Sequence, residues 1–421
     1  MSLPDIHEQL ADLQGVLEVA RQLGATTDLR TMLTYIERAA RSVMDCERAS
    51  VFLYDETSDE LYSYVATGIE GLRITAKRGI AGQAVRNRQP INVTDAYADP
   101  RFNPQVDAET GYRTRSMLTL PLIGLNDTIV GVLQMLNSRQ GSFSAWDEQL
   151  AGTLAAQAGA AIQRQILLDQ YAQKQKLEQD LAIARSIQQE LLPKCPPNVH
   201  GFDVAGWNKP ADQTGGDIYD FMPLDDGRLA ITIADATGHG IGPALVIAEC
   251  RALLRATACF SSDLNQVMVR VNTLLVRDLP PGRFVTCFFG LLDPVACTLH
   301  YSSAGHGPLL FLRAADGVVS EWPATGIPLG VAPDMAPVAS DPVPFAPGDM
   351  MVVVTDGFFE WLGPDRSQFG IDRLVDLIRR NRDRPAAEII QLLYRSVLEF
   401  GGGTTQQDDL TAIIIKRQAS G

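Results

Sequence analysis

Aspartate occurs at four points of the chain where an extended apolar run begins or ends, and glycine lies nearby at three of them. The stretch "GGDIYDF" places Asp217 after two glycines, and "LAITIADATGHG" ends an apolar run at Asp235. Further along, "MMVVVTDG" ends a second apolar run at Asp356, and "QQDDLTAIIIK" places Asp408 and Asp409 directly before a third. Short apolar runs rich in β-branched residues predict buried strands. The sequence therefore predicts carboxylates at several strand ends.

Carboxylates in this arrangement indicate divalent-cation chemistry. Hard cations such as Mg²⁺ and Mn²⁺ take oxygen ligands, and two of them about 3.5 to 4 Å apart can activate a water and clamp a phosphoryl oxygen. Clustered carboxylates without a cation repel one another and raise each other's pKa values. Glycine lets the backbone approach such ions closely. For any single aspartate the alternative is a turn-forming role, the usual use of Asp beside Gly.

Length and composition narrow the class of protein. A chain of 421 residues predicts two domains and a connector, and 46% hydrophobic residues allow large cores. The formal charge of -14 argues against a nucleic-acid partner, because affinity for nucleic acid depends on Lys and Arg neutralising phosphates. The six cysteines are scattered without a C-x-x-C pair, and we expect reduced thiols. Neither a signal peptide nor an apolar run of about 18 residues is present in the sequence, which predicts no membrane span and a cytoplasmic location.

Changes of periodicity divide the chain into three parts. Residues 1–163 begin with helical spacing and continue with hairpin-like strands such as "ASVFLYDETSDELYSYVAT", which predicts an α+β module. Residues 164–194 are helical and form a linker that ends at "PKCPP". Residues 195–417 return to strands and helices and contain all the aspartates above. We therefore predict an α+β protein of two domains joined by a long helix.

The linker carries a stripe that fits a helical seam between two subunits. Leu177, Leu181, Ala184 and Leu191 follow three-four spacing, and Gln188 fills the remaining slot. The length of this stretch and its polar residues outside the stripe favour a coiled coil in a homodimer. The alternative is a single helix that packs on its own domain.

The C-terminal part resembles a known enzyme family. The motifs "GGDIYDF", "ADATGHG", "SSAGHGP", "VVTDGFFE" and "QDDLTAII" occur in the order found in PPM-type (protein phosphatase 2C) serine/threonine phosphatases. The bacterial branch with the stage II sporulation phosphatase and the phosphatases that control stress sigma factors is most similar, and "LAIARSIQQELLPKCPP" resembles its usual lead-in. The resemblance covers about residues 195–417 and implies an α-β-β-α sandwich.

The resemblance also implies a site with two Mn²⁺ or Mg²⁺ ions. Asp217 and Asp235 would be the catalytic residues that bridge the ions, and an activated water would attack phosphorus directly without a phosphoenzyme. No counterpart is found for the phosphate-binding arginine of eukaryotic relatives, so metals would hold the substrate phosphate. Carried over residue by residue, the resemblance assigns metal ligation to Asp217, Asp235, the backbone carbonyl of Ala236, Asp356, Asp408 and, as a further candidate, Asp409. For His239 and His306, structural roles in tight loops are favoured over proton transfer.

The N-terminal part resembles a GAF domain, a sensor of small ligands built on an antiparallel sheet with flanking helices. The resemblance lies in "RGIAGQAVRNRQPINVTDAYADPRFNPQVDAETGYRTRSMLTLPLI" and "IVGVLQMLN". Cyclic-nucleotide-binding members carry an N-K…F-x-x-x-D-E signature, which this chain matches except that Ser138 replaces the Lys. The matching residues are Asn137, Phe143, Asp147 and Glu148. This signature supports the fold and leaves the ligand open, a cyclic nucleotide or a pocket used only for dimerisation included.

Together these features predict a signalling phosphatase with a GAF sensor, a helical transmitter and a metal-dependent catalytic domain. By resemblance, the substrate is a phosphorylated protein of the anti-anti-sigma (STAS) type, and we expect ligand binding to change helix packing at a dimer seam. Two alternative functions, of other classes than enzyme catalysis, stay open. The catalytic half could be a scaffold that binds a partner without turnover, or the chain could be chiefly a cyclic-nucleotide receptor.

Overall fold

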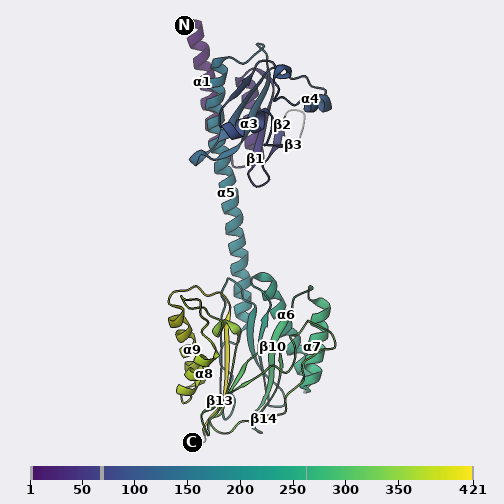
Figure 1. The fold of residues 1–421 in the computed structure, drawn as a ribbon, viewed down its shortest axis with the longest axis vertical. Helices are drawn as coiled ribbons and strands as arrows, with labels where there is room; N and C mark the ends of the chain where they lie inside the picture. The colour runs from purple at the N-terminus through teal and green to yellow at the C-terminus, as the bar shows by residue number, and fades with distance from the viewer. Residues whose placement is uncertain (1–2, 67–70, 262, 420–421) are drawn as a thin grey trace. The chain divides into compact units, whose positions relative to one another are not determined.

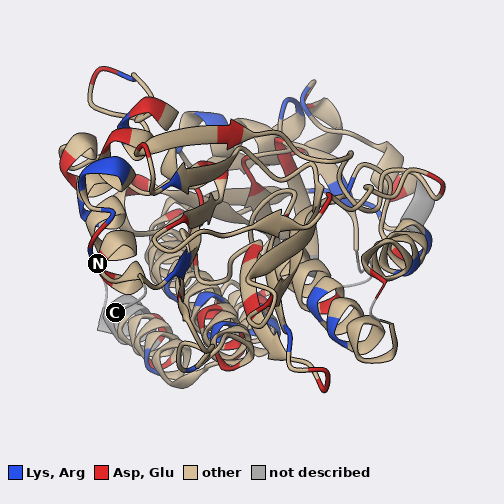
Figure 2. Ribbon diagram, turned by 90° about the horizontal axis from the view of Figure 1, so that it is seen from below, with Lys and Arg blue, Asp and Glu red and all other residues tan. Residues whose placement is uncertain are grey.

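The structure is a computed structural model that describes residues 3–66, 71–261 and 263–419 (Figure 1). The chain divides into two compact units, residues 1–176 and residues 177–421. In the described residues, no helix is both long and apolar enough to cross a membrane. Lys and Arg are interleaved with Asp and Glu along the helices (Figure 2).

The N-terminal unit is built on one antiparallel sheet. Its described strands pair in the order β3-β2-β1-β6-β5-β4. In chain order, the elements are α1 (Leu3–Ala25), α2 (Leu29–Val43), β1 (Cys46–Asp55), β2 (Glu60–Ala66), β3 (Arg73–Thr75), α3 (Gly79–Asn87), β4 (Ile91–Val93), the 3-10 turn η1 (Ala96–Ala98), α4 (Gln105–Thr110), β5 (Met117–Ile123), the 3-10 turn η2 (Leu125–Asp127), β6 (Ile129–Ser138) and α5 (Ala145–Leu191).

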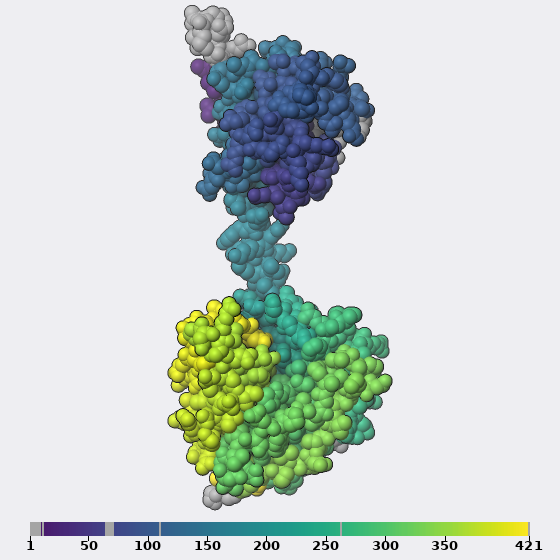
Figure 3. Space-filling model, viewed as in Figure 1, coloured from purple at the N-terminus to yellow at the C-terminus, as the bar shows by residue number. Residues whose placement is uncertain are grey.

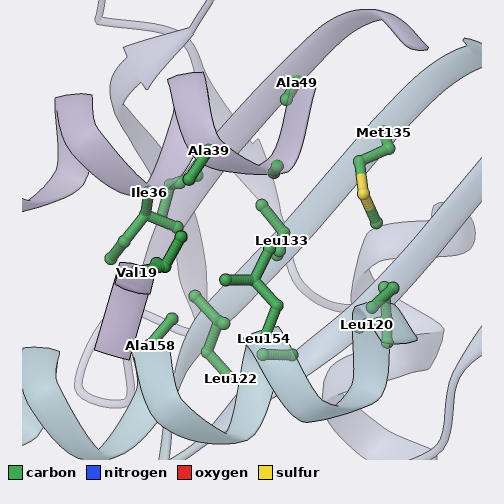
Figure 4. Close-up of a cluster of buried hydrophobic side chains, with 14 of the residues drawn as sticks. Val19, Ile36, Ala39, Ala49, Leu120, Leu122, Leu133, Met135, Leu154 and Ala158 are labelled. Atoms are coloured by element: carbon green, nitrogen blue, oxygen red, sulfur yellow. The ribbon is translucent and has the colours of Figure 1, made fainter. Parts of the chain in front are cut away.

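Alternation along the strands gives this sheet two different faces. Ala49, Val51 and Leu53 of β1 point into a core shared with α1, α2 and α5. Figure 4 shows part of this core, where Ile36 of α2 and Leu154 of α5 lie close to the sheet residue Leu133. Phe52, between Val51 and Leu53, points to the other face and packs against α3. This arrangement confirms the predicted antiparallel sheet with flanking helices.

The C-terminal unit contains two five-stranded sheets within its described residues. The strand orders are β14-β11-β10-β9-β8 and β13-β12-β15-β16-β7. In chain order, the elements are β7 (Phe202–Lys209), β8 (Asp217–Pro223), β9 (Leu229–Ala236), α6 (Ile241–Phe260), α7 (Leu264–Asp278), β10 (Val285–Asp293), β11 (Thr298–Ala304), β12 (Leu309–Arg313), β13 (Val318–Trp322), β14 (Val343–Pro344), β15 (Met350–Val354), the 3-10 turn η3 (Asp356–Phe358), α8 (Ile371–Arg380), α9 (Ala386–Gly401) and β16 (Leu410–Arg417).

The two sheets stack face to face and each carries helices on its outer side. Ile231 and Ile233 of β9 meet Met351 and Val353 of β15 in a core between the sheets. The alternate residues of β9 pack outward against α6 and α7, and those of β15 pack outward against α8 and α9. Figures 1 and 3 show α8 and α9 on one side of this unit and α6 and α7 on the other. The α-β-β-α sandwich is therefore confirmed.

The long helix α5 has different surroundings at its two ends. Its first turns, including Leu150, Leu154 and Ile162, are buried in the core of the N-terminal unit. In the stripe predicted as a dimer seam, Leu177 is 57% exposed. Leu191 packs against the core of the C-terminal unit beneath α6 and α7. The side chain at this end of the stripe therefore contacts residues of its own chain.

Candidate metal centre and a second cavity

Strand pairing brings the predicted aspartates together from both sheets. Asp217 and Asp235 are direct partners across the antiparallel strands β8 and β9. In the other sheet, Asp356 follows the end of β15, and Asp408 precedes the start of its neighbour β16. Because β15 and β16 are antiparallel, the end of one lies beside the start of the other. The described structure thus gathers four carboxylates at one end of the sandwich.

Two threonines connect the sheets at this point. The hydroxyls of Thr355 and Thr411 donate to the same carboxylate oxygen, Oδ2 of Asp217, at 2.8 and 2.7 Å. Both threonines are buried; Thr411 lies in β16 of the second sheet and Thr355 directly follows β15, whereas Asp217 begins β8 of the first sheet. The sequence analysis overlooked them. Their signal is a hydroxyl residue adjacent to Asp356 and another two residues after Asp409 in otherwise apolar strands.

The carboxylates raise one another's pKa. Burial, followed by the charges of Asp356 and Asp408, raises the pKa of Asp235 to about 7. Burial and the charge of Asp408 raise the pKa of Asp356 to about 6. For the buried Asp217, desolvation and the charge of Asp235 raise the pKa well above its ordinary value, although the two threonine hydroxyls oppose this shift. A protein without cations therefore holds these groups ionised only at a cost in free energy.

Glycine at position 216 allows a backbone carbonyl to approach the centre. A Cβ atom on Gly216 would lie 2.7 Å from the carbonyl oxygen of Ala236 and 3.3 Å from Oδ1 of Asp235. The amide of Ala236 donates to the carbonyl of Gly216 at 3.0 Å, which fixes the two strands at this point. The carbonyl of Ala236, which the sequence predicts to be a metal ligand, therefore lies close to Asp235. A side chain at position 216 would collide with this carbonyl.

The neighbouring Asp408 and Asp409 differ in their surroundings. Asp409 is buried, and its two carboxylate oxygens accept the amides of Ala211 and Asp217 at 2.7 and 3.2 Å. Asp408 is exposed and uses Oδ1 to accept the amide of Asp409 at 2.8 Å. Asp409 is thus occupied as an anchor for the loop before β8, while Asp408 keeps a carboxylate oxygen with no hydrogen bond among the described residues.

The donor set fits hard divalent cations in its chemistry. It consists of carboxylate oxygens and a backbone carbonyl, the ligands that Mg²⁺ and Mn²⁺ take, and positive charge would relieve the mutual repulsion seen in the raised pKa values. Within the described residues, no three His, Cys, Asp or Glu side chains already surround one point so that they could hold an ion.

The two histidines of the predicted loops lie in different environments. His239 is exposed, and its Nδ1 lies 3.4 Å from Oδ2 of the exposed Asp212. His306 is buried, with Nδ1 3.2 Å from the hydroxyl of Thr286, and burial lowers its pKa to about 4. Its neutral ring is enclosed within the fold.

An arginine that the sequence analysis overlooked lies beside the loop after Asp235. A guanidinium nitrogen of Arg283 donates to the carbonyl of Thr237. The same nitrogen would lie 2.5 Å from a Cβ atom on Gly238. Arg283 is distant from Asp235 in sequence and follows "LPPG", so only the fold identifies it as a neighbour of this loop.

The N-terminal unit contains a separate cavity of about 860 Å³. It lies over the sheet face opposite α5 and beside α3, and Phe52, Gln134 and Met117 contribute to its floor. Among the described residues of the lining there is one carboxylate, Asp107, which is buried. The basic residues along the wall are Arg48, Arg73, Arg78, Arg86 and Arg101.

Three of these arginines have no carboxylate partner in the described structure, and one of them, Arg86, donates to the backbone carbonyl of Ala76. Arg48 stacks over the ring of Tyr112 at 3.8 Å, and Arg78 has neither an ion-pair nor a hydrogen-bond partner among the described residues. By contrast, Arg101 is paired with Asp99 at 2.5 Å. The excess of positive charge at this cavity contrasts with the net charge of -14 of the whole chain.

The GAF signature residues lie behind this cavity and do not line it. Asn137 is fully buried, and its side-chain amide donates to the hydroxyl of Tyr112 at 2.7 Å. Phe143 packs in the core on the α5 side of the sheet. Asp147 caps the start of α5 by accepting the amide of Ser144 at 2.7 Å, and Glu148 follows it in the first turn. The signature therefore supports the fold, and Asn137 also holds a cavity residue in place.

Comparison with known proteins places both units in families. The sequence profile of the stage II sporulation protein E (SpoIIE) family matches residues 225–418, and that of the GAF domain matches residues 28–162. The chain thus combines a GAF domain with a SpoIIE-type, PP2C-like domain. Both resemblances predicted from the sequence are confirmed.

Individual relatives match this chain over part of its length. Protein IcfG of Synechocystis sp. is 28% identical over 56% of this chain, but the matched region spans only 41% of IcfG. Phosphoserine phosphatase RsbU of Bacillus subtilis is 27% identical over 58% of this chain and 72% of its own length. Among solved structures, the SiaA-PP2C domain of Pseudomonas aeruginosa is 25% identical with a TM-score of 0.52, over 58% of this chain and 98% of that domain.

Proposed function

We propose that this protein is a metal-dependent protein serine/threonine phosphatase whose activity is regulated through its GAF domain. The observation that carries the proposal is the meeting of Asp217, Asp235, Asp356 and Asp408 at the ends of strands from two sheets. Their raised pKa values mark a cluster that is short of positive charge. Two Mn²⁺ or Mg²⁺ ions would supply that charge, activate water and neutralise phosphoryl oxygens.

The residues of the chain would hold and orient this centre. Asp217 and Asp235 occupy adjacent strands and would hold the ions together with Asp356, Asp408 and the carbonyl of Ala236. The hydroxyls of Thr355 and Thr411 occupy Oδ2 of Asp217 and so direct Oδ1 toward the centre. Fixed groups of this kind lower the reorganisation needed when charge develops on a phosphoryl group.

Hydrolysis of p-nitrophenyl phosphate by the full-length protein tests this function. We expect activity with Mn²⁺ or Mg²⁺, none with EDTA, and a loss of about 10²-fold or more in Asp235→Asn, because the carboxylate that joins the two sites is neutralised. The matched control is Asp225→Asn, an exposed aspartate of the β8–β9 turn with no hydrogen bond among the described residues. Equal activity in wild type and Asp235→Asn would refute the assignment. Silence of the wild type with either metal would favour the non-catalytic scaffold.

The substrate class proposed is a phosphoserine or phosphothreonine on a STAS-type regulator. Support comes from the similarity to RsbU, which is named as a phosphoserine phosphatase. The test is release of phosphate from a phosphorylated STAS protein compared with a phosphorylated peptide of the same local sequence. A preference for the folded protein supports recognition of that partner, and equal rates would contradict it.

The cavity of the GAF domain is proposed as the site of an anionic regulator. Arg48 and Arg78 offer guanidinium groups that have no carboxylate partner among the described residues, and Asp107 could accept a donor from the same ligand. A cyclic nucleotide carries both a phosphate and base donors and is therefore the first probe. Calorimetric titration with cAMP and cGMP would detect binding. Binding of either one that survives Arg48→Gln with Arg78→Gln would contradict the assignment of these contacts.

A further inference from the structure

The last turns of α5 hold the loop that precedes β8. The side-chain amide of Gln188 donates through Nε2 to the carbonyl oxygen of Gly215 at 2.6 Å. Its Oε1 accepts the amide of Gly215 at 3.0 Å. Both backbone groups of one residue are thus satisfied by a single side chain from a different element. Gly215 itself is buried, whereas Gln188 is half-buried.

The residue held in this way packs on Asp409, the carboxylate that anchors the loop leading to Asp217 of the proposed metal centre. A Cβ atom on Gly215 would lie 2.5 Å from Oδ2 of Asp409, so the glycine packs directly on that carboxylate. Oδ2 also accepts the amide of Asp217, and Oδ1 accepts the amide of Ala211. The loop of residues 211–217 therefore wraps around Asp409, and its conformation sets where Asp217 begins β8.

A pair of hydrogen bonds of this kind can hold a loop in one conformation. Each neutral hydrogen bond makes a modest net contribution to stability, and a buried backbone group left without a partner is destabilising. The loop contains two consecutive glycines, which are the least constrained residues of the chain when nothing holds them. Loss of the Gln188 contact would let Gly215 and Gly216 leave the conformation that presents Asp217.

We infer that Gln188 is a positioning residue for the phosphatase reaction, which acts by fixing the 211–217 loop from the end of α5. The inference rests on the proposed function, and it assigns Gln188 a role inside the chain, in place of the seam position predicted from sequence. Gln188 contacts neither the substrate nor an ion. Its effect reaches the centre through Gly215, Asp409 and Asp217.

The test compares Gln188→Met with Gln189→Met in the full-length protein. Methionine preserves length and helix propensity but cannot make either hydrogen bond, and the exposed side chain of Gln189 has no hydrogen bond in the described structure. The first readout is amide hydrogen exchange of residues 211–217 without metal. We expect faster exchange in Gln188→Met only. A single cooperative unfolding transition in both variants, with the midpoint of Gln188→Met lowered by no more than a few degrees, is the check on folding.

The second readout is the affinity for Mn²⁺, measured by calorimetry, together with the Mn²⁺ concentration that gives half-maximal hydrolysis. We expect both to weaken roughly tenfold in Gln188→Met, corresponding to the loss of about 1.4 kcal/mol, while kcat at saturating Mn²⁺ changes less than about twofold. Unchanged exchange, or changed exchange with wild-type Mn²⁺ affinity, would overturn the inference. If the wild type binds Mn²⁺ without hydrolysing phosphate, the proposed function fails and the affinity comparison still decides the role of Gln188.

Discussion

The metal centre and the GAF cavity collect charges of opposite sign in different ways. At the centre, Asp217 and Asp235 are partners on adjacent strands and have no arginine partner among the described residues. The charge of Asp235 raises the pKa of Asp217, and the charges of Asp356 and Asp408 raise the pKa of Asp235. At the cavity, Arg48 is stacked on an aromatic ring and Arg101 is paired with Asp99. A buried cluster of like charge is unstable until a counter-ion arrives, whereas arginines at the edge of a cavity are already partly compensated. The first arrangement suits tightly bound metal ions, and the second suits a ligand that binds reversibly.

The largest effect is expected where backbone geometry at the metal centre is disturbed. Gly216→Ala would place a Cβ atom 2.7 Å from the carbonyl oxygen of Ala236, which only a shift of the backbone could relieve. We expect phosphatase activity to fall by about 10²-fold or more, because a displacement of about 1 Å at a catalytic centre has effects of this size. Gly242→Ala in the first turn of α6 is the control, since its Cβ atom would meet open space. Near-normal activity of Gly216→Ala would contradict the proximity of Ala236 to the ions.

Substitution of two aspartates of β8 by Asn should change the free energy of unfolding in opposite directions. Asp220 is buried and paired with Arg255 at 2.5 Å and Arg251 at 3.0 Å, so Asp220→Asn leaves two guanidinium groups without their counter-charge. We expect a loss of roughly 2–4 kcal/mol in the free energy of unfolding, less than for a wholly buried pair because Arg255 is partly exposed. Asp217→Asn removes repulsion and should stabilise the metal-free protein by about 1 kcal/mol.

Thermal unfolding of both variants in EDTA measures this difference. If Asp217→Asn destabilises the metal-free protein as much as Asp220→Asn does, the cluster is not under electrostatic stress and the contrast with the paired carboxylate is wrong.

Substitution of the arginines of the GAF cavity should weaken ligand binding and leave the basal phosphatase activity unchanged. We expect the double variant Arg48→Gln with Arg78→Gln to weaken binding of an anionic ligand by about tenfold or more, the scale of a lost charge-assisted hydrogen bond. The basal hydrolysis of p-nitrophenyl phosphate should remain within about twofold of wild type. The control is Arg88→Gln, an exposed arginine after α3 that does not line the cavity. Equal loss of affinity in the control would indicate a general charge effect.

The smallest expected effect is a pH dependence of stability in the metal-free protein. The folded state holds the pKa of Asp235 at about 7 and that of Asp356 at about 6, against an ordinary value of 3.8. Between these values the folded state binds more protons than the unfolded state, so the free energy of unfolding decreases as pH rises from about 4 to about 7. We expect the unfolding midpoint in EDTA to be a few degrees higher at about pH 5.5 than at about pH 7.5.

Saturating Mg²⁺ should reverse this trend, because ions compete with protons for the same oxygens and bind better as pH rises. A midpoint that rises with pH in EDTA, or one that Asp235→Asn leaves equally pH-dependent, would contradict the raised pKa values.

Sequence information was sufficient for the features encoded within short segments. The aspartates at the ends of apolar runs, the two resemblances and the helical linker were all visible, because a strand end, a glycine pair or a family motif occupies only a few consecutive residues. Thr355 and Thr411 are also part of such motifs, but their contact with Asp217 depends on the stacking of two sheets. That contact could not be predicted from spacing alone.

Features that join distant segments were missed or interpreted differently. The arginines of the cavity are distributed between residues 48 and 101 and meet only when α3 packs over the sheet. Gln188 fits the spacing of a helical seam, and periodicity cannot distinguish a partner helix from a loop of the same chain as its neighbour. In the structure its side chain bonds to Gly215, which is 27 residues away.

The most direct test of the account is a calorimetric titration of the metal-free, full-length protein with Mn²⁺, beside Asp235→Asn. The account predicts binding of two ions by wild type, accompanied by release of protons at about pH 6, because Asp235 and Asp356 are partly protonated before the ions arrive. The variant should bind more weakly by about tenfold or more and release fewer protons. Absence of binding in wild type, or identical titrations of the two proteins, would contradict the claim that these aspartates form a metal centre.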